Sequence, residues 1–132
     1  MSVSGKIWPG LMYFWALLIL FVSVIPGEAL PSISIWEPDK VMHATVYGIL
    51  TFLLFRTIKI RSLTYSLKKS ALTAFILCIF YGFIIELIQL MLPDRKFDLF
   101  DALANSIGCF ITLACILIFS APRQSAKLNS RH

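Results

Sequence analysis

The chain has 132 residues, of which 58% are hydrophobic and only 14% are charged, whereas soluble domains average about 45–50% apolar and about 25% charged residues. This composition excludes a soluble globular protein and allows one domain at most. The net charge of +5 does not indicate nucleic-acid binding, because the basic residues adjoin apolar runs, where they would meet an anionic membrane surface. The predicted partner is a lipid bilayer and no nucleic acid.

Four apolar segments account for most of the sequence. They cover about residues 7–25, 41–58, 70–92 and 99–119. About 20 helical residues span a hydrocarbon core of about 30 Å, and backbone in lipid must satisfy its own hydrogen bonds. The predicted fold class is therefore all-α, a four-helix transmembrane bundle, with Pro93 and Pro122 ending the third and fourth helices. A membrane domain over residues 1–121 and a basic cytoplasmic tail over 122–132 are expected.

Charge is distributed unevenly between the two sides of these segments. Nine of the twelve basic residues belong to one side: eight lie before the first segment, between the second and third, or after the fourth, and Arg56 lies near the inner end of the second. All seven acidic residues belong to the other side, with Glu86 and Asp101 near the outer ends of the third and fourth segments. The positive-inside rule therefore predicts an N-in/C-in topology. Three prolines and a glycine within residues 26–38 predict an irregular outer loop. The chemistry of the protein is expected in its outward half.

The second segment carries a polar stripe that descends from its outer end. Asp39, His43 and Tyr47 are spaced four residues apart, so they share one face of a helix, and Lys40 lies beside the top of this face. At a rise of 1.5 Å per residue, His43 lies about 6 Å and Tyr47 about 12 Å below Asp39. These residues are candidates for a site just beneath the membrane surface.

The third and fourth segments carry polar stripes at the same depth. Glu86 and Gln89 are three residues apart, and Asp101 and Asn105 are four residues apart. An ionisable group at mid-membrane costs at least about 2.5–3.5 kcal/mol, so such groups are expected to face one another. We predict an outward-facing polar pocket between helices 2, 3 and 4, with Arg95 at its rim.

Some polar and small residues have a purely structural explanation. Asp98 is suitably placed to cap the fourth helix, and Gln89 to join two helices by a hydrogen bond worth about 0.6 kcal/mol. Small residues at four-residue spacing on the second and fourth segments predict seams of close helix packing. These residues are Ala44, Gly48, Ala104, Gly108 and Thr112. The cysteines Cys78, Cys109 and Cys115 all lie in apolar segments and are expected to be inert.

Two blocks of sequence carry a more specific pattern. They are DKVMHATVYGIL from Asp39 to Leu50 and IIELIQLMLPDRKFDLFDALANSIG from Ile84 to Gly108. The first block fits the pattern D-K-x-x-H-x-x-x-Y. The second fits E-x-x-Q followed by P-x-R-x-x-x-x-x-D-x-x-x-N-x-x-G. With these two patterns the chain resembles the VanZ-like family of small bacterial membrane proteins. The matching residues are Asp39, Lys40, His43, Tyr47, Glu86, Gln89, Pro93, Arg95, Asp101, Asn105 and Gly108.

The resemblance implies a multi-pass protein of the bacterial cytoplasmic (inner) membrane. The namesake of the family is associated with reduced susceptibility to the lipoglycopeptide teicoplanin. The first function that follows is protective binding of a cell-envelope amphiphile at the outer leaflet, either a lipid-linked cell-wall precursor or a lipoglycopeptide. Lys40 and Arg95 would pair with phosphate or carboxylate. The predicted ligand-binding residues are Asp39, Lys40, Tyr47, Gln89, Arg95 and Asn105.

The alternative is an intramembrane acid/base enzyme that acts on a lipid-linked substrate. His43, Glu86 and Asp101 would be its catalytic residues. A metal-assisted variant would use Mg²⁺ or Mn²⁺, but the sequence has no closely spaced ligand pair, and no metal ligand is assigned. A proton-coupled carrier has less support, because the inner halves of the segments carry almost no charge apart from Arg56. Cofactors are unknown, and a homo-oligomer is compatible with the sequence.

Overall fold

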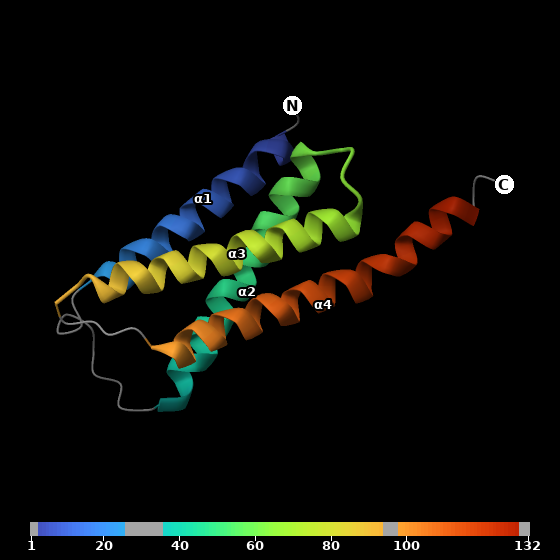
Figure 1. The fold of residues 1–132 in the computed structure, drawn as a ribbon. Coiled ribbons are helices and arrows are strands. Elements are labelled where there is room, and N and C mark those ends of the chain that lie inside the picture. Colours follow the sequence, from blue (N-terminus) through green and yellow to red (C-terminus); the bar gives the residue numbers. More distant parts are fainter. Residues whose placement is uncertain (1–2, 26–35, 94–97, 130–132) are drawn as a thin grey trace.

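The structure, a computed structural model, describes residues 3–25, 36–93 and 98–129. In these residues it consists of four α-helices that run alternately up and down (Figure 1). The helices are α1 (Val3–Val24), α2 (Trp36–Arg61), α3 (Leu67–Leu90) and α4 (Leu99–Asn129). Each contains an apolar stretch of at least 18 residues, long enough to cross a membrane. The predicted all-α fold with four membrane-spanning helices is confirmed.

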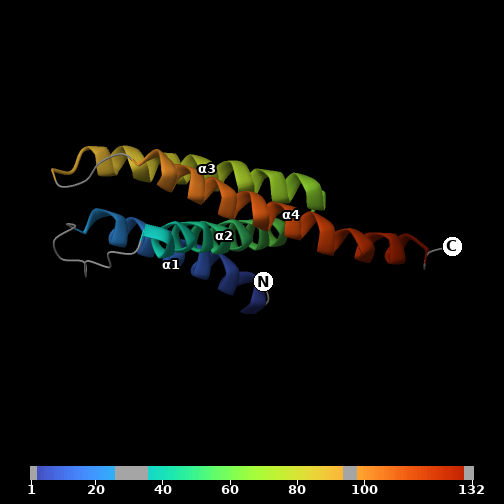
Figure 2. The same ribbon diagram turned by 90° about the horizontal axis from the view of Figure 1, so that it is seen from below.

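The two ends of the bundle differ in chemical character. α1 and α3 end, and α2 and α4 begin, at the end shown on the left in Figure 1. We call this the polar end, because the polar residues of α2, α3 and α4 described below lie there. α1 and α3 begin, and α2 ends, at the opposite, basic end, and α4 projects beyond it (Figure 2). The two chain termini are therefore on the same side of the bundle.

Several helices extend beyond the predicted segments. α2 begins at Trp36 instead of residue 41, with Pro38 in its first turn, where the missing N–H has no helical partner to lose. α1 begins at Val3 and includes Pro9. α4 continues through Pro122 to Asn129, because one missing donor does not end a helix whose following residues favour helical backbone.

The turn at the basic end is short and well defined. Ser66 caps α3, and its side chain accepts a hydrogen bond from the Lys69 amide at 3.2 Å. The Lys59 ammonium donates to the Tyr65 carbonyl at 2.6 Å. Further along, the Arg56 guanidinium lies 4.5 Å from the centroid of the Trp8 ring, a cation–π contact that keeps this charge near the basic end.

α2 and α4 make the closest helix contact in the bundle. A Cβ atom built on Gly108 would lie 1.9 Å from the Ala44 carbonyl oxygen, and one built on Gly48 would lie 3.0 Å from Thr112 Oγ1. The Thr112 hydroxyl donates to the Gly48 carbonyl at 3.2 Å. The predicted close packing of small residues is confirmed, and glycine is required at 108 because any side chain would collide with the facing backbone.

Cys78 and Cys109 are fully buried between the helices. Their thiols donate to the carbonyl of Tyr47, at 3.5 Å and 3.9 Å respectively. Cys115, in contrast, is exposed on α4. Two of the three cysteines are therefore core residues of the bundle, as expected for small apolar side chains.

α1 is attached to the bundle by three hydrogen bonds between side chains and backbone carbonyls. Trp15 Nε1 donates to the Val46 carbonyl on α2 at 3.0 Å. From α3, the Tyr81 hydroxyl donates to the Ala16 carbonyl at 2.6 Å, and Gln89 Nε2 to the Ser23 carbonyl at 3.3 Å. α1 contacts only α2 and α3 among the described residues.

Replacing Tyr81 by phenylalanine is expected to lower the free energy of unfolding by about 1 kcal/mol, because the substitution removes only the hydroxyl that holds α1. Unfolding of the purified protein in mixed detergent micelles, followed by circular dichroism, measures this. Tyr13→Phe is the matched control, since the Tyr13 side chain is 56% exposed and should lose nothing. Equal stability of the two variants would contradict the role given to Tyr81.

Candidate functional site

Lys40 joins the start of α2 to the start of α4. Its ammonium donates to Asp98 Oδ2 at 3.1 Å and also to the carboxylate of Asp101. Asp98 additionally caps α4, because its Oδ1 accepts a hydrogen bond from the Phe100 amide at 2.7 Å. Partial burial by itself would raise the pKa of Asp98, but the bonds from Lys40 and Phe100 outweigh it and lower the pKa below its usual range.

His43 lies one helical turn below Lys40 and faces α4. Its Nδ1 is 3.1 Å from Asn105 Oδ1, and its Nε2 is 3.9 Å from Asp101 Oδ2. Asn105 is only 4% exposed, and its Nδ2 has no hydrogen-bond partner among the described residues. We refer to Lys40, His43, Asp98, Asp101 and Asn105 as the polar cluster. It brings together four of the residues singled out in the sequence together with the helix cap.

Glu86 extends this polar region onto α3. Its side chain is 1% exposed, and it interacts electrostatically with Asp101 and His43. Oε2 has no partner within the described part of the chain. A buried carboxylate oxygen without a partner is costly, so Glu86 is the residue of the bundle that most needs an explanation.

Tyr47 is a further buried side chain with an unsatisfied polar atom. It is 3% exposed, and its hydroxyl has no hydrogen-bond partner in the residues that the structure describes. Its ring packs against Gly82 of α3, where an added Cβ would lie 3.0 Å from Tyr47 Cε1. Because Gly82 has no side chain, the Tyr47 ring has room to pack between α2 and α3.

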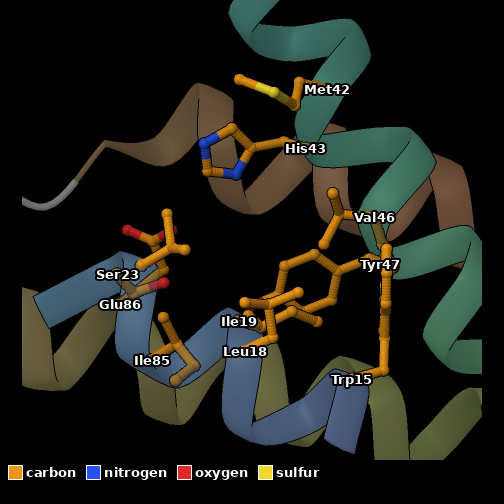
Figure 3. Close-up of a pocket in the computed structure, with 11 residues that line it drawn as sticks. Trp15, Leu18, Ile19, Ser23, Met42, His43, Val46, Tyr47, Ile85 and Glu86 are labelled. Atoms are coloured by element: carbon orange, nitrogen blue, oxygen red, sulfur yellow. Dashed lines mark hydrogen bonds between the residues drawn. The ribbon is translucent and has the colours of Figure 1, made fainter. Parts of the chain in front are cut away.

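A cavity of about 250 Å³ adjoins these groups. It is bordered by the His43 and Tyr47 rings of α2 and the Glu86 carboxylate of α3, with apolar side chains of α1 opposite them (Figure 3). The full lining consists of Trp15, Leu18, Ile19, Val22, Ser23, Met42, His43, Val46, Tyr47, Ile85 and Glu86. The space is close in size to small-ligand pockets and is apolar except at one side.

The position of this cavity differs from the predicted pocket between helices 2, 3 and 4. α1 forms one wall, and α4 contributes no described lining residue. The physical reason is the close contact at Gly108, and the space that α2 and α4 border together is a separate, open groove that includes Ala44, Gly48, Gly108 and Thr112. The sequence analysis did not predict the contribution of α1, because this helix carries no charged residue beyond Lys6. Trp15 was the available signal, since a tryptophan N–H within an apolar helix needs an acceptor.

The remaining predicted site residues lie elsewhere or outside the described residues. The Gln89 side chain donates to a backbone carbonyl of α1. It therefore joins two helices by a hydrogen bond, which is the structural explanation given for it above. Arg95 lies outside the described residues, and so does the side chain of Asp39, although its backbone belongs to the first turns of α2. No group of three or more histidine, cysteine or acidic side chains is positioned to hold a metal ion in the part of the chain that the structure describes.

Comparison with known proteins gives one family and one curated relative. The model of the family described as VanZ/LLP1 matches residues 10–120. An uncharacterised protein of Schizosaccharomyces pombe, C11E3.10, is 29% identical over 107 residues. The match covers 81% of this chain and 63% of that relative, so the chain spans less than two thirds of the length of the yeast protein. No solved structure matches.

Proposed function

The chain belongs to the VanZ/LLP1 family, and we propose that it binds the headgroup of a membrane amphiphile at its polar end. The observation that carries this proposal is the cavity of about 250 Å³ lined by Glu86 and Tyr47, each of which carries a buried polar atom, Oε2 and Oη, without a partner among the described residues. A ligand with a polar head would satisfy both atoms, while the apolar side chains of α1 would contact the start of its hydrocarbon chain.

The side of the membrane follows from charge. The basic residues around the α2–α3 turn favour a cytoplasmic location for the basic end, so the cavity would open toward the outer leaflet. In a bacterial cytoplasmic membrane, a cell-envelope amphiphile such as a lipid-linked cell-wall precursor or an inserted lipoglycopeptide would be available there. Binding of such a molecule would lower susceptibility to antibiotics of the teicoplanin type.

The relative in a yeast broadens the range of ligands to consider. Its printed name gives no activity, but its presence in a fungus favours a headgroup that is not confined to bacterial cell walls. Under this proposal, reduced antibiotic susceptibility would be one consequence of lipid binding and not its purpose.

The residues of the site would then divide into two groups. Glu86, Tyr47 and His43 would contact the headgroup, because they border the cavity. Asp101 and Asn105 would hold His43 in place from α4. Lys40 is engaged by two aspartates, so its part would be to hold α2 against α4 and not to pair with a phosphate. Pairing of Arg95 with phosphate or carboxylate stays a prediction.

A strain that lacks the protein should become more susceptible to teicoplanin, and the wild-type gene should restore growth. Glu86→Gln should fail to restore it, because the amide replaces the buried carboxylate that borders the cavity. Thr45→Ala is the control, since Thr45 lies on α2 and bonds only the Val41 carbonyl. The minimum inhibitory concentration and the amount of protein in the membrane are measured together. Full restoration by Glu86→Gln would remove Glu86 from the site.

The alternative function is acid/base catalysis on a lipid-linked substrate. It is favoured by the approach of His43 Nε2 to Asp101 Oδ2 at 3.9 Å and by the electrostatic interaction of Glu86 with both residues. A histidine held by a carboxylate and facing a second, buried carboxyl group has the composition of a proton-transfer site. Envelope lipids extracted with and without the protein would differ in their lipid-linked species if it were an enzyme. Identical profiles would leave binding as the function.

A further inference from the structure

We infer that the polar group which the cavity accepts is the primary ammonium group of an amphiphile, and not its phosphate. The inference rests on the proposed binding function and names the ligand chemistry. It depends on three observations. These are the net negative charge of the polar end, the pairing of Lys40 with two aspartates, and the unsatisfied oxygen atoms of Glu86 and Tyr47.

The polar end attracts cations. By sequence, all seven acidic residues but only three of the twelve basic residues belong to the α1–α2 and α3–α4 connections and the helix turns beside them. With His43 neutral, this end has a formal charge of −4. An anionic headgroup would approach against that charge, whereas a cation would be drawn to it over roughly the Debye length of 8–10 Å.

The described cation of the site is already paired. Lys40 is held between Asp98 and Asp101, and these two carboxylates exceed its single charge. The Lys40 side chain is not among the residues that line the cavity. A phosphate that entered the cavity would therefore meet the Glu86 carboxylate without a described cation to neutralise it.

Two residues that line the cavity carry unsatisfied oxygen atoms that can accept a hydrogen bond. Glu86 Oε2 is an acceptor when ionised, and the Tyr47 hydroxyl can also accept. A primary ammonium has three N–H donors and the charge that compensates a buried carboxylate. A trimethylammonium group has the charge but no donor, and a phosphodiester has neither. The chemistry of the site thus selects the primary ammonium among common headgroups.

The apolar walls determine what the ammonium is attached to. Seven of the eleven lining residues are apolar: Trp15, Leu18, Ile19, Val22, Met42, Val46 and Ile85. A hydrophilic amine such as free ethanolamine would leave this surface without contacts, while the first carbons of an amphiphile would cover it. The ligand class is therefore an amphiphile with a primary amine, for which phosphatidylethanolamine is a convenient probe.

The test uses Trp15 as a reporter, because it lines the cavity. The full chain with Trp8→Phe and Trp36→Phe is placed in phosphatidylcholine nanodiscs, and its fluorescence is followed as phosphatidylethanolamine or phosphatidylglycerol with the same acyl chains is added. Phosphatidylethanolamine should bind at least about tenfold more tightly than either other lipid, as expected for a charge-assisted hydrogen bond. Soluble ethanolamine should have no effect, and an effect equal to that of the lipid would assign the site to a free amine.

Two variants locate the effect. Glu86→Gln should remove the preference for phosphatidylethanolamine, and Tyr47→Phe should reduce it severalfold, whereas Thr45→Ala, on the same helix but outside the cavity, should leave it unchanged. The lipid preference of the wild-type protein tests the ammonium assignment by itself, so the test holds even if a variant fails to fold. Equal binding of all three lipids, or tighter binding of phosphatidylglycerol, would overturn the ammonium assignment and leave headgroup binding intact. No response of Trp15 to any lipid would overturn the binding function itself.

Discussion

Replacing Gly108 by alanine is expected to destabilise the bundle by about 3 kcal/mol or more, at the upper end of the cost of overpacking. The new methyl group would lie 1.9 Å from the carbonyl oxygen of Ala44 and 2.6 Å from its carbonyl carbon. These are backbone atoms, which cannot rotate away as the end of a side chain can. The two helices would therefore have to separate along the contact that holds the polar cluster together.

Gly10→Ala is the matched control for this substitution. It makes the same chemical change in a helix interior, but nothing lies within 4 Å of the added Cβ. Because alanine favours helical backbone over glycine by about 1 kcal/mol, this variant should be as stable as the wild type or slightly more so. Detergent-induced unfolding, followed by circular dichroism, compares the two. If the Gly108→Ala protein were as stable as the Gly10→Ala protein, α2 and α4 would not pack as described.

Replacing Lys40 by methionine is expected to cost about 2 kcal/mol of unfolding free energy. Methionine keeps the length of the side chain but leaves Asp98 and Asp101 adjacent without the cation between them. Breaking a buried ion pair costs about 3–5 kcal/mol, and the exposure of Asp98, whose side chain is 45% accessible, reduces this figure. Adding Asp101→Asn to Lys40→Met should recover part of the loss, because it removes one of the two uncompensated charges.

The contribution of Asp98 to this network has a defined pH dependence. Its pKa is lowered in the folded protein, so the stabilisation is fully present above its unfolded pKa of about 3.9 and is lost as the pH falls through the lower, folded value. Lys40→Met should flatten the stability profile in this acidic range. Lys68→Met, at an exposed position near the basic end, serves as the control and should leave the profile unchanged. If the stability of Lys40→Met changed with pH as that of the wild type does, the pairing of Lys40 with Asp98 would be contradicted.

The bundle could be predicted from the sequence because a membrane restricts the backbone to a few solutions. Long apolar runs in lipid must be helical, and four of them were found at nearly the predicted positions. The ends of the helices were predicted less accurately than their existence, because the prediction assumed that proline ends a helix. At Pro38 and Pro122 the chain is helical on both sides, because proline removes a donor without preventing the neighbouring residues from being helical.

The polar cluster could also be predicted, because charge in a membrane needs a partner. Lys40, His43, Asp101 and Asn105 meet as their spacing and common depth required. What could not be predicted was the location of empty space, which depends on how closely each pair of helices approaches. The contact of Gly108 with Ala44 brings α2 and α4 together, and the cavity that His43, Tyr47 and Glu86 line lies against α1.

The attachment of α1 has a consequence for how this helix can vary among relatives. Two of its three anchoring bonds come from α3 and end on carbonyl oxygens of α1, and every amino acid has such an oxygen. Among the described side chains of α1, Trp15 donates the third of these bonds. Substitutions elsewhere along α1 would therefore reshape the apolar wall of the cavity without removing these bonds. Under the proposed binding function, variation in α1 would change the preferred acyl chain and leave the headgroup chemistry unchanged.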